Sequence, residues 1–222
     1  MNEARAREEI CRVGRSLFER GYVHATAGNI SVRLDAEEGG GCLVTPTDAC
    51  LGFLDPARLA RLDADGRQIA GDTASKSLAL HLAIYAAARR FDPVRCILHT
   101  HSTHCVALTL EPRTELLDPI TPYFVMKVGH VPIVPYRRPG APETASAVTA
   151  AIARYGEAGT PIRAVMLERL GPNVWHETPA AAMAVLEELE ETARLVVLAA
   201  NAPRPLTGAQ IDELRSAFGA RW

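Results

Sequence analysis

The chain has 222 residues, of which 48% are hydrophobic and 23% are charged, with a formal net charge of -2. This length and balance predict one globular α/β domain, residues 1–222, with a substantial buried core. The absence of excess positive charge argues against nucleic-acid binding, and no apolar run suits a signal peptide or a membrane span, so we expect a cytoplasmic protein.

Helices and strands alternate in the first half of the chain. Apolar residues at helical spacing predict an amphipathic helix at 4–20. Two strand-like runs follow, AGNISVRL (27–34) and GCLVTPT (41–47), separated by a loop rich in glycine and acidic residues. The alanine-rich and leucine-rich stretch at 74–90 predicts a second helix, and the apolar run VRCILHTHST (94–103) predicts a strand after it.

The second half opens with a proline-rich stretch at 119–142. A helix is predicted at 143–155, and the strand RAVMLE (163–168) leads to a turn at Gly171–Pro172. Thr178 is expected to cap a long helix that begins at Pro179.

That long helix carries an EELEE run at 187–191, which we interpret as a solvated face. The tail predicts a final helix, with an exposed Trp222 available to pack on a neighbouring subunit. Helices before and after strands predict a central sheet covered by helices. The five cysteines are odd in number, widely spaced and without a CxxC pair, so they are expected to be reduced thiols of the core.

The sharpest chemical signal is His99-Thr100-His101 at the end of the apolar strand. Alternate residues of a strand face the same side, so both imidazoles have a spacing able to grip one divalent ion. A metal site normally needs three protein ligands, and the alternative is two polar strand-end histidines. His104 is a further candidate, but it points away unless a helix begins there.

A second signal combines amide, hydroxyl and ammonium donors from three segments. Phosphate favours such donors beside a helix start, and the candidates are Asn29, Thr45, Ser75 and Lys76. Each segment also has a structural interpretation, as a turn, a strand end or a helix cap.

Taken in order, these motifs resemble one family. AGNIS, LVTPT, the SK helix start, the H-x-H strand, VPYRRPG and the AVxLxxxGP strand at 164–172 are similar to the class II aldolase and adducin family. The likeness is closest to its 3-oxo-tetronate 4-phosphate decarboxylase branch, through phrases such as SLFERG, HSTH and LEELEETARL.

The resemblance implies a three-layer α/β/α sandwich with a mixed, largely antiparallel sheet, assembled as a homotetramer. It implies a divalent metal, zinc or else manganese, and a small phosphorylated sugar or sugar acid as ligand. Carried over by residue, His99 and His101 become metal ligands, and Asn29, Thr45, Ser75 and Lys76 become phosphate or substrate contacts. Tyr123 and Tyr136 stand where tyrosines reach the site or the neighbouring subunit.

Two departures from the family pattern concern catalysis. Ser77 occupies the position of the usual acidic residue, and its hydroxyl cannot act as a carboxylate base near neutral pH. Leu170 occupies the position of the third metal histidine, and Glu168 or His81 are the groups that could compensate. Two hypotheses follow: a metal-dependent decarboxylase or aldolase, or a catalytically impaired binding or assembly protein.

Overall fold

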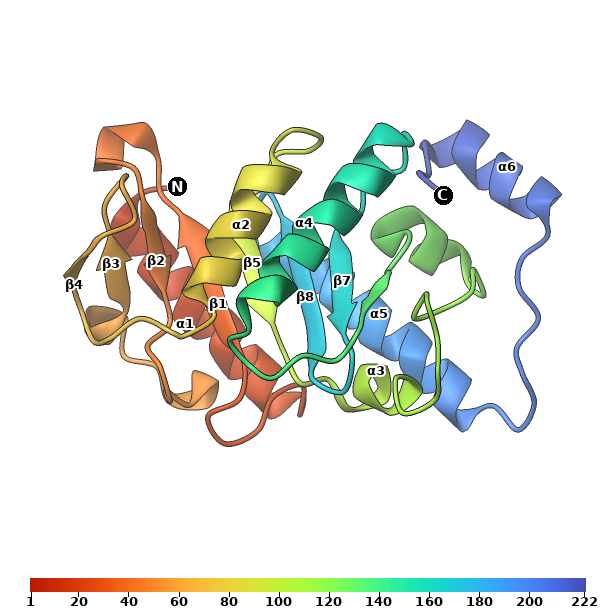
Figure 1. Cartoon of the computed structure of the whole chain (residues 1–222), viewed down its shortest axis with the longest axis horizontal. Helices are drawn as coiled ribbons and strands as arrows, with labels where there is room; N and C mark the ends of the chain where they lie inside the picture. Colours follow the sequence, from red (N-terminus) through yellow and green to blue (C-terminus); the bar gives the residue numbers. More distant parts are fainter.

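The computed structural model describes residues 1–222 and contains one eight-stranded sheet with helices on both faces (Figure 1). The strands are β1 (Asn29–Arg33), β2 (Cys42–Val44), β3 (Ala60–Leu62), β4 (Gln68–Ala70), β5 (Cys96–His99), β6 (Ile133–Val134), β7 (Ala164–Leu167) and β8 (Gly171–His176). The α-helices are α1 (Glu3–Glu19), α2 (Leu78–Ala88), α3 (Thr103–Leu108), α4 (Pro142–Glu157), α5 (Pro179–Leu198) and α6 (Gly208–Phe218). Short 3-10 turns are η1 (Ala36–Glu38), η2 (Leu51–Phe53) and η3 (Pro56–Arg58), and a π-helical turn is η4 (Phe124–Val128).

The sheet runs in the order β4-β3-β2-β1-β5-β8-β7-β6. Every neighbouring pair is antiparallel except β6 and β7, which are parallel. The register places Asn29 of β1 opposite His99 of β5, and His99 opposite Asn173 of β8. Three polar residues therefore form one row across the middle of the sheet.

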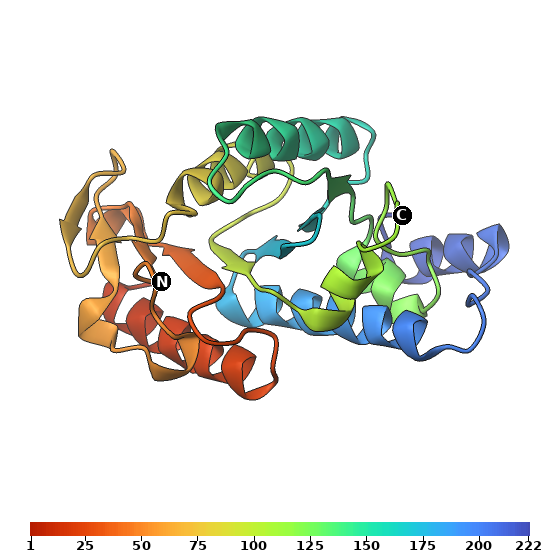
Figure 2. The same ribbon diagram turned by 60° about the horizontal axis from the view of Figure 1, so that its bottom comes forward.

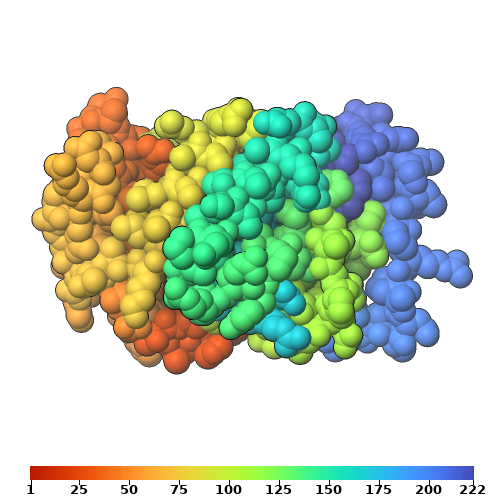
Figure 3. All heavy atoms as spheres, viewed as in Figure 1, coloured from red at the N-terminus to blue at the C-terminus, as the bar shows by residue number.

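The helices form two layers with the sheet between them. Figure 2 shows α2 and α4 on one side and α1 and α5 on the other, and the space-filling view shows α2 and α4 covering their face (Figure 3). The larger apolar cluster joins the sheet to α1, α3 and α5, and a second cluster lies under α2 and α4 around the buried Trp175. The predicted three-layer α/β/α sandwich with a mixed, largely antiparallel sheet is confirmed.

Local sequence explains where the long helices begin. The Asn2 side chain accepts a hydrogen bond from Arg5 N at 2.9 Å and caps α1. The Thr178 side chain accepts from Ala181 N at 3.1 Å, with Pro179 at the first position of α5, as predicted.

Element boundaries near the histidines differ from the sequence prediction. Strand β5 ends at His99, and α2 begins at Leu78 rather than at residue 74. The hairpin turn lies at 168–170 rather than at Gly171–Pro172, which already belong to β8. Glycine is required at residue 171 because the backbone of the Thr100 segment approaches it closely, and not because of a turn. The φ angle of Gly171 is +144°, and a Cβ there would lie 1.9 Å from the Thr100 carbonyl oxygen.

The EELEE interpretation is wrong at one residue. Glu190 is only 4% exposed, and its carboxylate accepts hydrogen bonds from the backbone N–H groups of His104 and Cys105 at 3.0 and 3.1 Å. These residues form the first turn of α3, where the N–H groups lack partners within the helix. An acid inside the helix layer therefore caps a neighbouring helix.

The remaining expectations concern the cysteines and the tail. All five cysteines are unpaired, and burial raises the pKa of the Cys42 thiol to about 11, so it stays protonated at neutral pH. Trp222 stacks on His130 of its own chain, with ring centroids 4.3 Å apart, and also contacts Phe124. None of the helices combines the length and apolar character needed to cross a membrane.

Candidate active site

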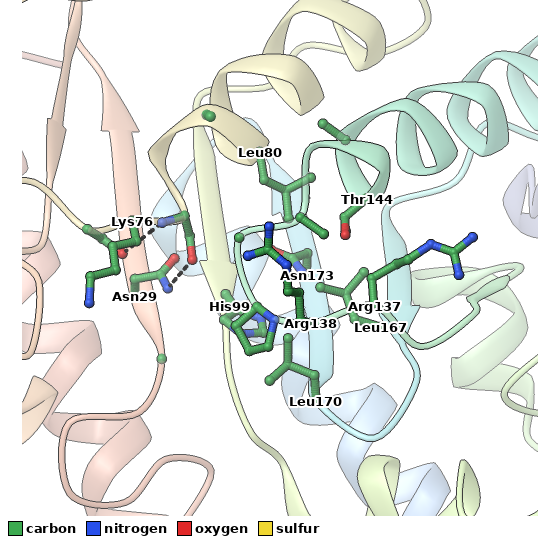
Figure 4. Close-up of a pocket in the computed structure, with 18 of the residues that line it drawn as sticks. Asn29, Lys76, Leu80, His99, Arg137, Arg138, Thr144, Leu167, Leu170 and Asn173 are labelled. Carbon is green, nitrogen blue, oxygen red and sulfur yellow. Dashed lines mark hydrogen bonds between the residues drawn. The ribbon is translucent and has the colours of Figure 1, made fainter.

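A cavity of 430 Å³ opens at the ends of the central strands, where β5 ends and β8 begins. The beginnings of α2 and α4 border it, together with the loops at 26–28, 46–48 and 135–140. Helix starts present unpaired N–H groups and the positive end of the helix dipole, so two of them favour anions here. Lys76 and Arg137 lie on opposite sides of the cavity, with Asn173 between them (Figure 4).

His99 has a defined tautomer on the cavity floor. Its Nδ1 lies 3.0 Å from the Pro172 carbonyl oxygen, which can only accept, so Nδ1 carries the proton and Nε2 offers a lone pair. Burial, with a smaller contribution from the neighbouring His101, lowers the pKa of His99 to about 4. The imidazole is therefore neutral at physiological pH.

His101 lies beyond the end of β5, yet its ring meets that of His99. The two ring centroids are 5.2 Å apart, so the predicted proximity of the two imidazoles is confirmed. His101 N donates to the Tyr22 carbonyl at 3.1 Å, and burial and then His24 lower the pKa of the His101 ring. The His24 ring lies 6.0 Å from His101 and adds a third imidazole that the sequence analysis missed.

Several of the expected phosphate contacts come together at the start of α2. Asn29, Ser75, Lys76 and Ser77 all line the cavity. Asn29 Nδ2 donates to Ser77 Oγ at 3.1 Å, and Ser77 N donates to Ser75 Oγ at 3.3 Å. Lys76 is exposed and has no carboxylate partner, so its charge is available to an anion.

Thr45 does not join this group, contrary to the sequence prediction. It is 1% exposed and does not line the cavity. Its Oγ1 accepts from Ile30 N at 3.1 Å, which fastens the end of β2 to β1. The Thr45 side chain is thus held between two strands, behind the residues that line the cavity.

The opposite wall carries two arginines from the loop between β6 and α4. Arg137 and Arg138 line the cavity and form no salt bridge, whereas Asp48 and Glu168 are its only acidic lining residues. Arg138 turns toward the cavity and Arg137 turns away from it (Figure 4). Lys76 and Arg138 therefore bring positive charges to the cavity that no carboxylate of the chain neutralises, which favours an anionic ligand.

The three predicted metal ligands do not assemble. Glu168 lies in the hairpin turn, and its Oε2 accepts from Tyr136 N at 2.7 Å, so this carboxylate anchors the arginine-bearing loop. No group of three His, Cys, Asp or Glu side chains in the chain could hold a metal ion. The Nδ1 hydrogen bond of His99 suits a metal ligand, but the position of the expected third ligand, in the same cavity lining as His99 and His101, is Leu170. The residues of this chain do not fit a three-ligand site.

The two tyrosines lie outside the cavity of the single chain. Tyr123 is 58% exposed and Tyr136 is 57% exposed, and neither lines the cavity. The Lys127 ammonium lies 5.2 Å from the centre of the Tyr123 ring. Any contact of Tyr123 with a ligand therefore requires a site other than this cavity.

Asn173 is the polar lining residue that sequence reasoning missed. It is completely buried, and neither Nδ2 nor Oδ1 has a hydrogen-bond partner. Asn29 Oδ1 and His81 Nε2 are also buried without partners. His81 does not line the cavity: its Nδ1 lies 2.8 Å from Ser31 Oγ, and burial lowers its pKa to about 3. An asparagine inside an apolar strand was the available signal, because strands disfavour this residue.

Comparison with known proteins gives a consistent picture. The family described as "Class II Aldolase and Adducin N-terminal domain" matches residues 8–197. A 3-oxo-tetronate 4-phosphate decarboxylase of Cupriavidus necator is 48% identical, with 99% of both chains covered, and that of Escherichia coli K12 is 40% identical, with 96% and 97% covered.

Solved structures agree with these relatives. The crystal structure of YgbL from Escherichia coli superposes with a TM-score of 0.84 at 39% identity, covering 96% of this chain and 99% of that one. An L-fuculose 1-phosphate aldolase shares the fold, with a TM-score of 0.79 at 22% identity and 96% of each chain covered. Members of this family typically use a divalent metal. The chain belongs to the class II aldolase and adducin family.

Proposed function

We propose that this protein decarboxylates 3-oxo-tetronate 4-phosphate or a closely related phosphorylated 3-oxo sugar acid. The observation that carries the proposal is the cavity, where Lys76 and two arginines lie on opposite walls without acidic partners. A substrate with a phosphate at one end and a carboxylate at the other suits two separated positive regions. The similarity to 3-oxo-tetronate 4-phosphate decarboxylases along almost the whole chain supports the same choice.

We assign the phosphate to the α2 side of the cavity. There Lys76 supplies an ammonium, and Ser75 and Asn29 supply hydroxyl and amide groups beside the helix start. A dianion gains from backbone N–H groups at a helix start and from a charged donor together. This assignment leaves the carboxylate and the oxo group nearer to Arg138.

The chemistry needs an electron sink more than a strong base. The bond between C1 and C2 breaks, CO2 leaves, and its electron pair forms the C2–C3 double bond while negative charge moves to the C3 oxygen. A proton then adds to C2 and gives dihydroxyacetone phosphate. Loss of a carboxylate base, with Ser77 in its place, is therefore compatible with this reaction.

Two features of the walls assist the reaction in our proposal. The Arg138 guanidinium is a permanent charge that stabilises the developing oxyanion. Leu80, Leu167 and Leu170 form an apolar part of the lining, which withdraws the substrate carboxylate from water and favours its departure as neutral CO2. Leu170 thus has a role as a wall residue in place of a ligand.

We propose that a divalent ion, zinc or else manganese, binds this chain only weakly, through His99 and His101. Two imidazoles provide fewer bonds than the three protein ligands of ordinary catalytic zinc sites. No step of the reaction above is assigned to the ion.

We also propose that the protein is a cytoplasmic homotetramer. Tyr123 and Tyr136 are exposed and offer amphipathic surface to a neighbouring subunit. Five unpaired cysteines are consistent with a reducing compartment. Light scattering at micromolar concentration tests the tetramer, and a monomer contradicts it.

The decisive experiment measures CO2 and dihydroxyacetone phosphate released from 3-oxo-tetronate 4-phosphate, with and without added zinc or manganese. An enzyme-free sample corrects for spontaneous decarboxylation. Release no faster than in this control, under all metal conditions, refutes the proposed activity. Tight binding without turnover favours a binding or assembly protein, the alternative suggested by Ser77 and Leu170.

A further inference from the structure

Asn173 occupies a position at which an amide side chain has no structural purpose. It is the third residue of β8, between Pro172 and Val174, and its side chain is completely buried at the cavity floor (Figure 4). Both polar atoms of its amide lack a partner anywhere in the chain. Buried polar groups in folded proteins are nearly always hydrogen-bonded, so this exception requires an explanation.

The immediate neighbours do not supply the missing bonds. The His99 ring lies in the same cross-strand row, but its Nδ1 proton is donated to the Pro172 carbonyl. Asn29, at the other end of the row, uses its Nδ2 on Ser77 and leaves its own Oδ1 unpaired. Two residues that line the cavity, Asn29 and Asn173, therefore have unfilled hydrogen-bonding capacity.

The unpaired donor and acceptor of the Asn173 amide indicate which chemical group would bind there. An asparagine amide offers an NH2 donor group and an oxygen acceptor side by side, and a substrate hydroxyl can accept from the first and donate to the second. The anionic ends of the substrate are better matched to Lys76 and Arg138 on the walls. In 3-oxo-tetronate 4-phosphate the only hydroxyl is the one on C2, between the carboxylate and the oxo group.

We infer that Asn173 is a specificity-determining residue that binds the C2 hydroxyl of the substrate through both amide atoms. This inference rests on the proposed function for the identity of the ligand. It makes the site selective for 2-hydroxy compounds over their 2-deoxy counterparts. A site built to hydrogen-bond a hydroxyl rejects analogues that lack it, because its own buried groups are then left unpaired.

The test uses equilibrium binding, which does not depend on turnover. The probes are 4-phosphoerythronate, a stable reduced counterpart of the substrate, and 3-hydroxy-4-phosphobutanoate, which lacks only the C2 hydroxyl. Calorimetry compares both probes in the wild type, in Asn173→Val and in Asn173→Thr. Valine and threonine have the same shape, so the pair separates hydrogen bonding from volume.

We expect removal of the hydroxyl to weaken binding to the wild type about 10- to 100-fold and to leave binding to Asn173→Val nearly unchanged. Asn173→Thr should keep part of the discrimination. Asn173→Val should also raise Tm by about 2 to 4 °C, because an unpaired buried amide is removed. A Tm gain together with lost selectivity is not expected of a residue that serves only the fold.

Equal discrimination between the two probes in the wild type and in Asn173→Val overturns the inference. If the valine variant does not fold, the same comparison in Asn173→Thr decides, and undiminished discrimination there overturns it. A wild type that binds neither probe overturns both this inference and the proposed function. Selective binding that depends on Asn173, without CO2 release from the oxo acid, refutes the decarboxylase alone.

Discussion

Replacing Leu170 with histidine is expected to convert a two-imidazole site into a three-imidazole site. Leu170 is partly buried and lines the cavity together with His99 and His101. Its position is fixed by the hydrogen bond from Leu170 N to the Leu167 carbonyl at 3.0 Å and by the adjoining contact of Gly171 with Thr100. An imidazole at residue 170 therefore starts from a rigid backbone beside the two existing rings.

The magnitude follows from the free energy of zinc sites. Structural sites with four ligands have binding free energies of about 10 to 16 kcal/mol, or about 3 kcal/mol for each ligand. One added imidazole should then tighten zinc binding about 100-fold. Loss of the partly buried leucine should lower the stability of the metal-free protein by about 1 kcal/mol.

Competition with a chromophoric chelator at constant pH measures this change. Leu170→Asn is the matched control, because it introduces polarity at the same place without an imidazole. Zinc affinity that is equal in Leu170→His and Leu170→Asn refutes the reasoning. Tight zinc binding by the unmodified protein also refutes it and points to His24, whose ring lies 6.0 Å from His101, as the first further ligand to remove.

Three further changes test other parts of the structure. Lys76→Met should weaken binding of a phosphorylated sugar acid about tenfold by calorimetry, while Lys127→Met, which replaces the other lysine, should have no effect. Burial lowers the pKa of His81 from its ordinary 6.5 to about 3, so below pH 6.5 the unfolded chain binds a proton at this residue that the folded chain does not bind. The folded state is therefore fully stable with respect to this group above pH 6.5 and loses stability as the pH falls toward 3. Urea unfolding between pH 6 and 4 should show a loss of about 1.4 kcal/mol per pH unit from this group, absent in His81→Gln; an equal slope in both proteins contradicts it. Glu190→Ala should reduce the free energy of unfolding by about 2 to 4 kcal/mol, because the buried N–H of Cys105 and the partly buried N–H of His104 lose their acceptor. An equally small effect in Glu190→Ala and in the exposed Glu191→Ala would show that the cap is unimportant.

Local patterns in the sequence were sufficient to predict much of the fold. The spacing of apolar residues in α1 and the Thr178–Pro179 start of α5 are short-range signals, and both predictions are confirmed. The proximity of His99 and His101 was also predictable, because residues that are only two positions apart in the chain cannot lie far from each other. The strand end at His99 was not predicted, because it is set by where pairing with β1 and β8 stops, and that long-range pairing is not visible in the local sequence.

Which residues form the site could not be fully predicted, because it depends on contacts between segments that are distant in the sequence. Thr45 has the same sequence signature whether its hydroxyl faces a ligand or, as here, the backbone of β1. Glu168 shares a short segment with Leu170, yet a hairpin turn directs its carboxylate to Tyr136 N. The unpaired amide of Asn173 becomes visible only when the register of three strands places it beside His99. These features arise from long-range pairing, which the order of motifs alone does not specify.

The contact between Gly171 and the Thr100 carbonyl has a consequence for how this site can change over time. Backbone atoms, and not the side chain of residue 170, keep the hairpin against the histidine segment. The identity of residue 170 can therefore vary between a ligand and a wall without displacing His99 or His101. The backbone position and the side chain at residue 170 are thus independent of each other. A change of one codon can then exchange a metal-binding histidine for an apolar wall residue while the fold of the cavity is kept.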